Sequence, residues 1–212
     1  MTYGIIISSY KYGHLAAHAI ESVLSQTDKF DKIMFVDDGA GDCGHLIDLY
    51  SDRVEFVIRH QNLGTVENFN EMLHRINTDY VMFLGADNWL RSDALSEMKT
   101  HLQLNSQQPA VVVYDIMITG ELKNEIFKLY PHQINPSQGE LLWNRKGYHH
   151  GSMLYHRQTA IDLGGYANNG TSVRTDEDLN LWDKFQKAGH KTVHVELPLL
   201  YYRRHKENFN KY

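Results

Sequence analysis

Two oxygen-bearing side chains follow a short apolar run near the middle of the sequence. The run is Val81–Leu84, and Gly85 separates it from Asp87 and Asn88. Four apolar residues that end at a glycine are too few for a helix and predict a buried parallel strand. Ligands bind at the carboxyl ends of such strands, where carboxylate and amide oxygens suit a divalent cation carrying a diphosphate. The alternative is that Asp87 and Asn88 cap the next helix, and this stretch alone supports both interpretations equally.

Polar side chains also follow two earlier apolar runs. The run 5–7 is followed by Tyr10, in a polar loop. The run 33–36 is followed by Asp38, in an acidic and glycine-rich turn. Because the carboxyl ends of parallel strands lie at one edge of a sheet, we expect Tyr10, Asp38 and Asp87 to converge. This convergence predicts a nucleotide-like ligand beside a metal ion.

The first hundred residues alternate apolar runs with helical patterns, joined by short loops. Such alternation predicts a parallel sheet wound by crossover helices. The elements that we expect are strand 5–7, helix 14–26, strand 33–36, helix 44–50, strand 54–58, helix 66–76 and strand 80–84.

The second half is less regular. Its last strong helix opens near Thr175, which forms a pattern resembling a capping box with Asp178. Asp178 therefore lies in the first turn, above Trp182 and Phe185 on the face directed at the core. The elements that we expect here are helix 92–104, strand 110–118, a hairpin or loop excursion with a short helix over 120–148, strand 151–155, helix 157–163, the helix after 175, and closing strands 192–195 and 199–202.

Composition limits the class of protein. The 212 residues are 42% apolar and 22% charged, which is typical of a globular α/β domain. A net charge of -5 gives no general reason to expect nucleic-acid binding. Cys43 is the only cysteine, so no disulfide forms within the chain. We see neither a signal-peptide pattern nor an apolar run long enough to cross a bilayer.

The series of loops resembles the inverting glycosyltransferases of family 2. Each motif is weak alone, but together they come in the family's order and cover nearly the whole chain. The resemblance rests on residues 9–11 with 20–27, 36–42, 62–64 with Asn68, 85–88, and 177–179 with Trp182. It implies the GT-A fold, an α/β architecture in which helices flank both faces of a Rossmann-like, mostly parallel central sheet. It also implies a single domain over 1–212, with a nucleotide-sugar-binding half at 1–105 and an acceptor and catalytic half at 106–212.

The resemblance implies an enzyme that moves a sugar with inversion. The donor is a nucleotide-diphosphate sugar, with a UDP-sugar favoured, and the acceptor is a glycan or a lipid-linked glycan. Asp178 is implied as the general base, and Asp87 and His205 as contacts of Mn²⁺ or Mg²⁺, with Arg203 or Arg204 assisting at the diphosphate. The implied nucleotide-binding residues are Ser9, Tyr10, Asp38, Asn62, Asn68 and Ala86.

One position departs from the family's pattern. Its metal motif is usually Asp-any-Asp, and Gly85 stands at the first position. Glycine has no side chain to bind a ribose or a metal ion, so Asp38 or water is a candidate to compensate. Two alternatives stay open: a nucleotide-sugar-binding module without turnover, and a sugar nucleotidyltransferase. The second needs a basic, glycine-rich loop, which residues 8–13 match poorly.

Simpler roles also exist for these residues. The carboxylate of Asp178 could instead serve only as a charge that the helix dipole favours. The ring of Tyr10 could instead be part of the hydrophobic core. His205 could instead be an ordinary surface histidine, and residues 203–206 could be a solvated basic tail. We interpret Asp37 as structural. We expect a cytoplasmic protein, with the cytoplasmic face of a membrane as the open alternative.

Overall fold

The first half of the chain builds a parallel sheet. The computed structural model describes residues 1–105, 109–122, 134–137, 140–143, 153–168 and 177–208. Its first four long strands pair in parallel in the order β3-β2-β1-β4. They are β1 (Tyr3–Ser9), β2 (Lys32–Asp37), β3 (Glu55–Ile58) and β4 (Tyr80–Gly85). The predicted parallel sheet of the first half is confirmed.

The second half extends the same sheet, mainly by antiparallel pairing. Strand β9 joins β4 to β6, β10 runs parallel to β6, and β5 forms the end of the path. A hairpin of β7 and β8 pairs with β6, which confirms the hairpin expected within 120–148. These strands are β5 (Trp89–Leu90), β6 (Val111–Thr119), β7 (Ile134–Ser137), β8 (Glu140–Trp143), β9 (Leu154–His156) and β10 (Thr192–Arg203).

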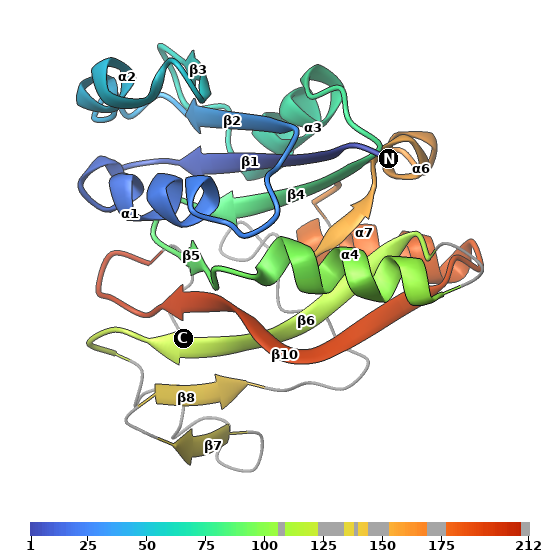
Figure 1. The fold of residues 1–212 in the computed structure, drawn as a ribbon. Helices are drawn as coiled ribbons and strands as arrows, with labels where there is room; N and C mark the ends of the chain where they lie inside the picture. Colours follow the sequence, from blue (N-terminus) through green and yellow to red (C-terminus); the bar gives the residue numbers. More distant parts are fainter. Residues whose placement is uncertain (106–108, 123–133, 138–139, 144–152, 169–176, 209–212) are drawn as a thin grey trace.

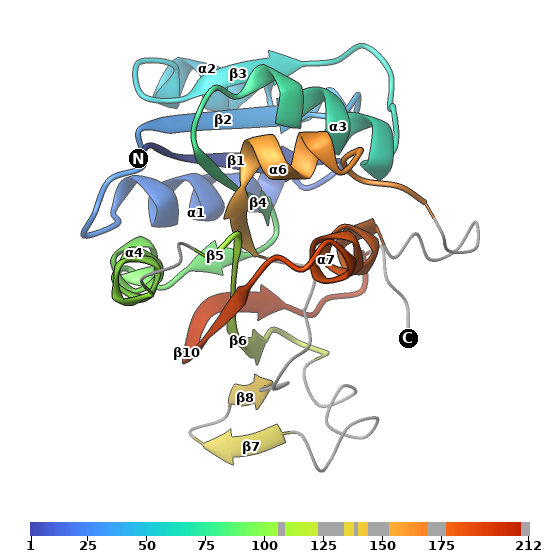
Figure 2. The same ribbon diagram turned by 90° about the vertical axis from the view of Figure 1, so that its right-hand side faces the viewer.

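Helices cover both faces of the sheet, as expected (Figures 1 and 2). One face carries α1 (Gly13–Leu24), α2 (Gly44–Tyr50) and α4 (Ala94–Leu104). The other carries α3 (Thr65–Arg75), α6 (Arg157–Asp162) and α7 (Glu177–Lys187).

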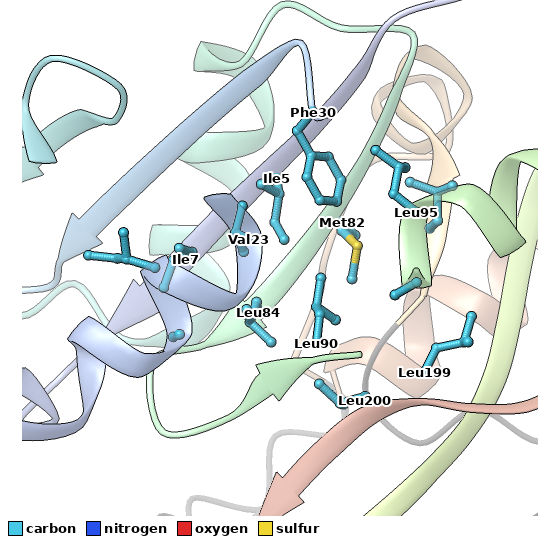
Figure 3. Close-up of a cluster of buried hydrophobic side chains, with 14 of the residues drawn as sticks. Ile5, Ile7, Val23, Phe30, Met82, Leu84, Leu90, Leu95, Leu199 and Leu200 are labelled. Carbon is cyan, nitrogen blue, oxygen red and sulfur yellow. The ribbon is translucent and has the colours of Figure 1, made fainter. Parts of the chain in front are cut away.

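Alternation along each strand divides the buried residues into two cores. On β1, Ile5 and Ile7 belong to the core beneath α1 and α4, whereas Ile6 belongs to the core beneath α3 and α7. Figure 3 shows the first core, where Leu90 of β5 and Leu199 of β10 extend the packing into the second half of the sheet. Because both faces are covered, β1, β2 and β4 are apolar along their middles, and their polar side chains are confined to their ends.

Three expectations about elements are wrong. The two closing strands are one strand, β10, because pairing with β6 resumes after the register shifts around Pro198. The two-residue strand β5 was not expected, since so short a pairing leaves no periodic pattern. Helix α4 begins at Ala94 with Asp93 at its N-cap, so Asp87 and Asn88 do not cap it.

Some expectations fall outside the described residues. The capping position at Thr175 is one, and most of the segment expected to hold a short helix between 120 and 148 is another. In the part of the chain that the structure describes, no helix is both long and apolar enough to cross a membrane.

Helix α7 is held to the sheet by two fully buried side chains, Leu181 and Phe185. We expect Phe185→Ala to lower the free energy of unfolding by about 3–5 kcal/mol, because it removes a buried aromatic ring and leaves a cavity. Urea denaturation measures this change. The control is Leu104→Ala on α4, where the side chain is 76% exposed and we expect a change within about 0.5 kcal/mol. Equal effects of the two substitutions would contradict this account of the core.

Candidate functional site

The ends of three parallel strands are aligned in register. Ser9 pairs with Asp37 across β1 and β2, and Ser8 pairs with Gly85 across β1 and β4. The backbone N–H of Asp38 donates to Ser9 O at 2.8 Å, which continues the alignment into the loops. The N–H of Ala86, a fully buried residue, donates to Ser8 O at 2.9 Å. The predicted convergence of these strand ends is confirmed, and their arrowheads point to one side in Figure 1.

Asp38 organises the neighbouring loop. Its carboxylate accepts hydrogen bonds from Asn62 Nδ2 at 3.1 Å, Leu63 N at 3.1 Å and Gly64 N at 3.2 Å. Burial raises the pKa of Asp38, while the Leu63 N–H and the Arg59 guanidinium act in the opposite direction. Asp38 and Asn62 are therefore brought together as expected, and their polar groups are largely engaged with each other and with the loop backbone.

Arg59 is a charged residue of this edge that the sequence analysis did not single out. It follows β3, lies 3.3 Å from Asp38 through Nε, and is only 11% exposed at its side chain. Its Nη2 donates to Asn68 Oδ1 at 3.2 Å, and Asn68 Nδ2 donates to Ser8 Oγ at 3.0 Å. The rule that polar residues follow strands would have found Arg59 had it been applied to the end of β3.

Tyr10 lies at the rim of the site, with 41% of its surface exposed, so its interpretation as a core residue is wrong. The Lys11 ammonium lies 4.9 Å from the centre of the Tyr10 ring. Lys11 has a φ of 67°, and it is the only described residue other than glycine with a positive φ. Such strained backbone is concentrated at ligand-binding loops, which is consistent with a functional loop here.

Ser9 belongs to a buried cluster behind the rim. Cys43 donates to Ser9 Oγ at 3.5 Å and to Asp42 Oδ1 at 3.2 Å. Burial raises the pKa of the Cys43 thiol to about 12, so the thiol stays protonated at neutral pH. Ligand atoms of Asp37, Asp42 and Cys43 lie within 4.8 Å of one another. These three side chains are a second group, besides the pair described next, whose ligand atoms are close enough to hold a metal ion.

Asp87 and His205 meet at the end of β4. Asp87 is 7% exposed, and its Oδ2 lies 3.2 Å from His205 Nε2. Two adjacent ligands of an octahedral ion with bonds of about 2.1 Å lie about 3 Å apart, so these two atoms have the separation of a ligand pair. Their donor types, a carboxylate oxygen and an imidazole nitrogen, suit a divalent transition metal. The structure thus brings together two predicted metal contacts from opposite ends of the chain.

Two simpler interpretations of the C-terminal region are wrong. His205 is not an ordinary surface histidine, because its side chain is 11% exposed and its ring packs edge-on against Tyr12 at 5.4 Å. Residues 203–206 are not a solvated tail, because Arg204 is 5% exposed and the Arg203 N–H donates to Asn88 Oδ1 at 2.9 Å. The end of β10 is therefore joined to the end of β4.

Gly85, the departure from the metal motif, is closely approached by the ends of two side chains. A Cβ atom at this position would lie 2.8 Å from both Asn88 Nδ2 and Asp87 Oδ1. The space that a side chain would occupy is therefore filled by the two residues that follow the strand. Asp38 does not take the place of the missing carboxylate, since its own oxygens hold residues 62–64.

Asp178 lies in the first turn of α7 and is partly buried. Burial raises the pKa values of Tyr155 and Tyr166, whose hydroxyls lie 2.7 Å apart, and the Asp178 charge raises both further. The Tyr166 ring packs edge-on against Phe83 at 5.6 Å, two residues before Gly85 on β4. The tyrosines whose pKa values the Asp178 charge affects therefore contact β4, the strand that precedes Asp87.

A cavity of about 560 Å³ opens beside the metal pair and shares His205 with it. It lies between the start of α1, β5, the end of β6 and the end of β10. Its lining combines apolar surface with charged side chains of both signs. The polar and aromatic residues of this lining include His14, Trp89, Glu121, Arg203 and Lys206.

Comparison with known sequences gives a consistent assignment. Residues 4–164 match the family described as Glycosyl transferase family 2. The chain is 24% identical over 214 residues to EpsE of Bacillus subtilis (strain 168), which is provisionally named a glycosyltransferase. That alignment covers 98% of this chain and 74% of EpsE.

Solved structures share the fold at low sequence identity. TarS 1-349 of S. aureus in complex with UDP-GlcNAc has a TM-score of 0.72 and 12% identity, covering 99% of this chain and 60% of TarS 1-349. The mannosyltransferase PcManGT of Pyrobaculum calidifontis in complex with GDP-Man and Mn²⁺ has a TM-score of 0.69 and 14% identity. The alignment covers 98% of this chain and 58% of PcManGT. This chain therefore spans less than two thirds of the length of either solved protein.

The packing around Gly85 can be tested by adding one methyl group. A glycine-to-alanine change in a strand ordinarily stabilises by about 0.5–1 kcal/mol. In Gly85→Ala, the ends of the Asn88 and Asp87 side chains must shift, and we expect the shift of Asn88 to weaken the hydrogen bond that its Oδ1 accepts from the Arg203 N–H. We expect the free energy of unfolding to fall by about 1 kcal/mol.

Chemical denaturation measures this change, and Gly44→Ala is the control. No atom lies within 4 Å of a Cβ added at Gly44, the first residue of α2. We expect that control to be neutral or stabilising. A stabilising effect of Gly85→Ala would show that the position tolerates a side chain.

Proposed function

The chain belongs to glycosyltransferase family 2 and has the GT-A fold, and from this premise we propose that it is an inverting, metal-dependent glycosyltransferase. The donor is a UDP-sugar, and the acceptor is a hydroxyl of a glycan or of a lipid-linked glycan. The observation that carries the proposal is the contact between Asp87 and His205 at the aligned strand ends. This contact provides two ligands for a divalent ion where the fold brings a donor diphosphate.

The nucleotide is proposed to bind along the ends of β1 and β2. The exposed ring of Tyr10 flanks the base, and the Asp38 carboxylate accepts a hydrogen bond from it. Asn62 and Asn68, which already contact Asp38 and Ser8, hold these groups in place. TarS has been solved with UDP-GlcNAc and PcManGT with GDP-Man. The fold therefore accommodates both bases, and we favour uridine for this chain because of its resemblance to the UDP-dependent members.

The divalent ion is proposed to bind Asp87 and His205, with Mn²⁺ preferred over Mg²⁺. Imidazole binds transition metals more readily than it binds Mg²⁺, and His205 supplies that imidazole. When bound, the ion neutralises charge on the leaving diphosphate. The guanidinium of Arg203, which lines the cavity beside His205, adds positive charge on the same side.

The transfer step is proposed to use Asp178 as the general base. The acceptor oxygen attacks the anomeric carbon, the bond from that carbon to the diphosphate oxygen breaks, and the hydroxyl proton passes to the Asp178 carboxylate. Attack opposite the leaving group inverts the anomeric configuration. Helix α7, fixed by Leu181 and Phe185, gives this carboxylate a rigid support.

We propose that residues 1–105 form the nucleotide-sugar half of one domain over 1–212, and that residues 106–212 form the acceptor and catalytic half. The first half carries all the proposed nucleotide contacts, and the second carries Asp178 and His205. A lipid-linked acceptor would bring the protein to the cytoplasmic face of a membrane.

The metal role of Asp87 can be tested by ligand-dependent stability. We expect UDP with Mn²⁺ to raise the melting temperature more than UDP alone, because a ligand that binds only the folded state stabilises it. In Asp87→Ala, the additional shift caused by Mn²⁺ should disappear while the fold is retained.

The matched control is Asp28→Ala, which removes a surface carboxylate paired with Lys99 far from the strand ends in sequence. It should keep the full shift. An unchanged response in Asp87→Ala would reject the metal role, and a much larger response to GDP than to UDP would reject the uridine assignment.

The base role is tested by Asp178→Asn, which keeps the size of the side chain and removes its basicity. We expect transfer to fall by roughly 10²-fold or more, while donor and metal affinities are retained. Turnover and calorimetric donor affinity are measured on the same preparation.

The control is Asp183→Asn on the same helix, where an exposed carboxylate pairs with Lys187. It should leave turnover unchanged. Near-normal turnover in Asp178→Asn would move the base elsewhere, with Glu177 next in line, and lost donor binding would make Asp178 a structural residue.

A further inference from the structure

The end of the described chain folds back over the strand ends. We refer to Arg203–Asn208 as the clasp. Its first residue is joined to Asn88, as described above, and its Glu207 carbonyl accepts a hydrogen bond from the Tyr12 hydroxyl at 2.9 Å. The clasp therefore contacts both the loop after β1 and the loop after β4. These are two of the three loops on which the proposed donor site depends; the third follows β2.

The Asn208 side chain makes hydrogen bonds to three groups around it. It is 4% exposed, and its Nδ2 donates to Asp87 Oδ2 at 2.9 Å and to Arg203 O at 3.1 Å. Its Oδ1 accepts from the His205 backbone N–H at 2.6 Å. Both amide protons and one oxygen lone pair are used, and every partner is either a proposed metal ligand or part of the clasp backbone.

We propose that Asn208 is a positioning residue that holds Asp87 and His205 at the separation required by a divalent ion. The two ligands are 118 residues apart in the chain, on separate elements. Asn208 touches both, through the carboxylate of one and the backbone of the other. Groups that orient metal ligands in this way strongly affect metal affinity. This inference rests on the proposed metal-dependent function.

An amide suits this position better than a carboxylate does. Asn208 donates to Asp87 Oδ2, and within the described residues the other carboxylate oxygen, Oδ1, makes no hydrogen bond. Asn208 thus uses one lone pair of Oδ2 and orients this oxygen beside His205 Nε2, which leaves the other lone pair of Oδ2 and both of Oδ1 for a metal ion. A carboxylate at position 208 would repel Asp87 and has no N–H to donate.

The departure at Gly85 makes this positioning more important. The usual motif has two carboxylates, and this chain retains one, Asp87. A site with few ligands depends on holding each ligand in the correct orientation before the ion arrives. Asn208 supplies that support directly at Asp87 Oδ2, and Asn88 holds the start of the clasp through the Arg203 N–H.

The test compares Asn208→Leu and Asn208→Ala with the unsubstituted chain. Leucine keeps a similar volume without hydrogen bonds, and alanine removes both volume and bonds. The control is Asn105→Ala, which removes an exposed amide that donates to His101 O at 2.8 Å at the end of α4. Mn²⁺ affinity is measured by electron paramagnetic resonance of free Mn²⁺ with saturating UDP present, and UDP affinity without metal by calorimetry.

We expect both Asn208 variants to bind Mn²⁺ about 10–100-fold more weakly, with metal-free UDP affinity unchanged. The Asn105 control should match the unsubstituted chain in both measurements. Unchanged Mn²⁺ affinity in the Asn208 variants would overturn the proposal while leaving the metal-dependent function intact. Loss of both affinities together would also overturn it, since it would show a general structural role. If the unsubstituted chain bound no Mn²⁺ with UDP, the proposed metal dependence and this inference would fall together.

Discussion

The in-register parallel pairing of β2, β1 and β4 is the constraint on which the site depends. It fixes Ser9 beside Asp37 and Ser8 beside Gly85, so the loops after these three strands start next to one another at the same edge of the sheet. Covering helices exclude polar side chains from the strands themselves, and polar groups gather where the strands end. The site is therefore a direct consequence of burying a parallel sheet on both faces.

Two kinds of polar group lie at this edge. The first kind is engaged in maintaining the loops, as Arg59 and Asn68 are through their contacts with each other and with Ser8. The second kind has capacity left for a ligand, as Asp87 does at Oδ1 and the exposed Tyr10 does through its ring. The groups of the first kind make the loops rigid. Because the loops are rigid, the few groups of the second kind are held in position to bind a ligand.

The second half of the chain reaches the same edge by a different route. Strand β10 continues past the register shifts at Pro198 and brings Arg203 and His205 beside the end of β4. Helix α7 approaches from the face that carries α3, and the buried pair Tyr155 and Tyr166 fills the space between α7 and β4. His205 and Asn208 contact Asp87 itself, whereas the tyrosines beside α7 reach β4 at Phe83.

The sequence by itself determined the features that local patterns encode. Apolar runs located β1, β2 and β4, helical spacing identified the buried face of α7, and the rule of strand ends grouped Tyr10, Asp38 and Asp87. Tertiary structure alone decided the contact between Asn208 and Asp87, the filling of the space at Gly85 by Asn88, and the continuity of β10 through Pro198. The physical reason is separation along the chain. Local patterns report whether a residue is buried and in which element, whereas a contact across 121 residues depends on how all the intervening elements pack.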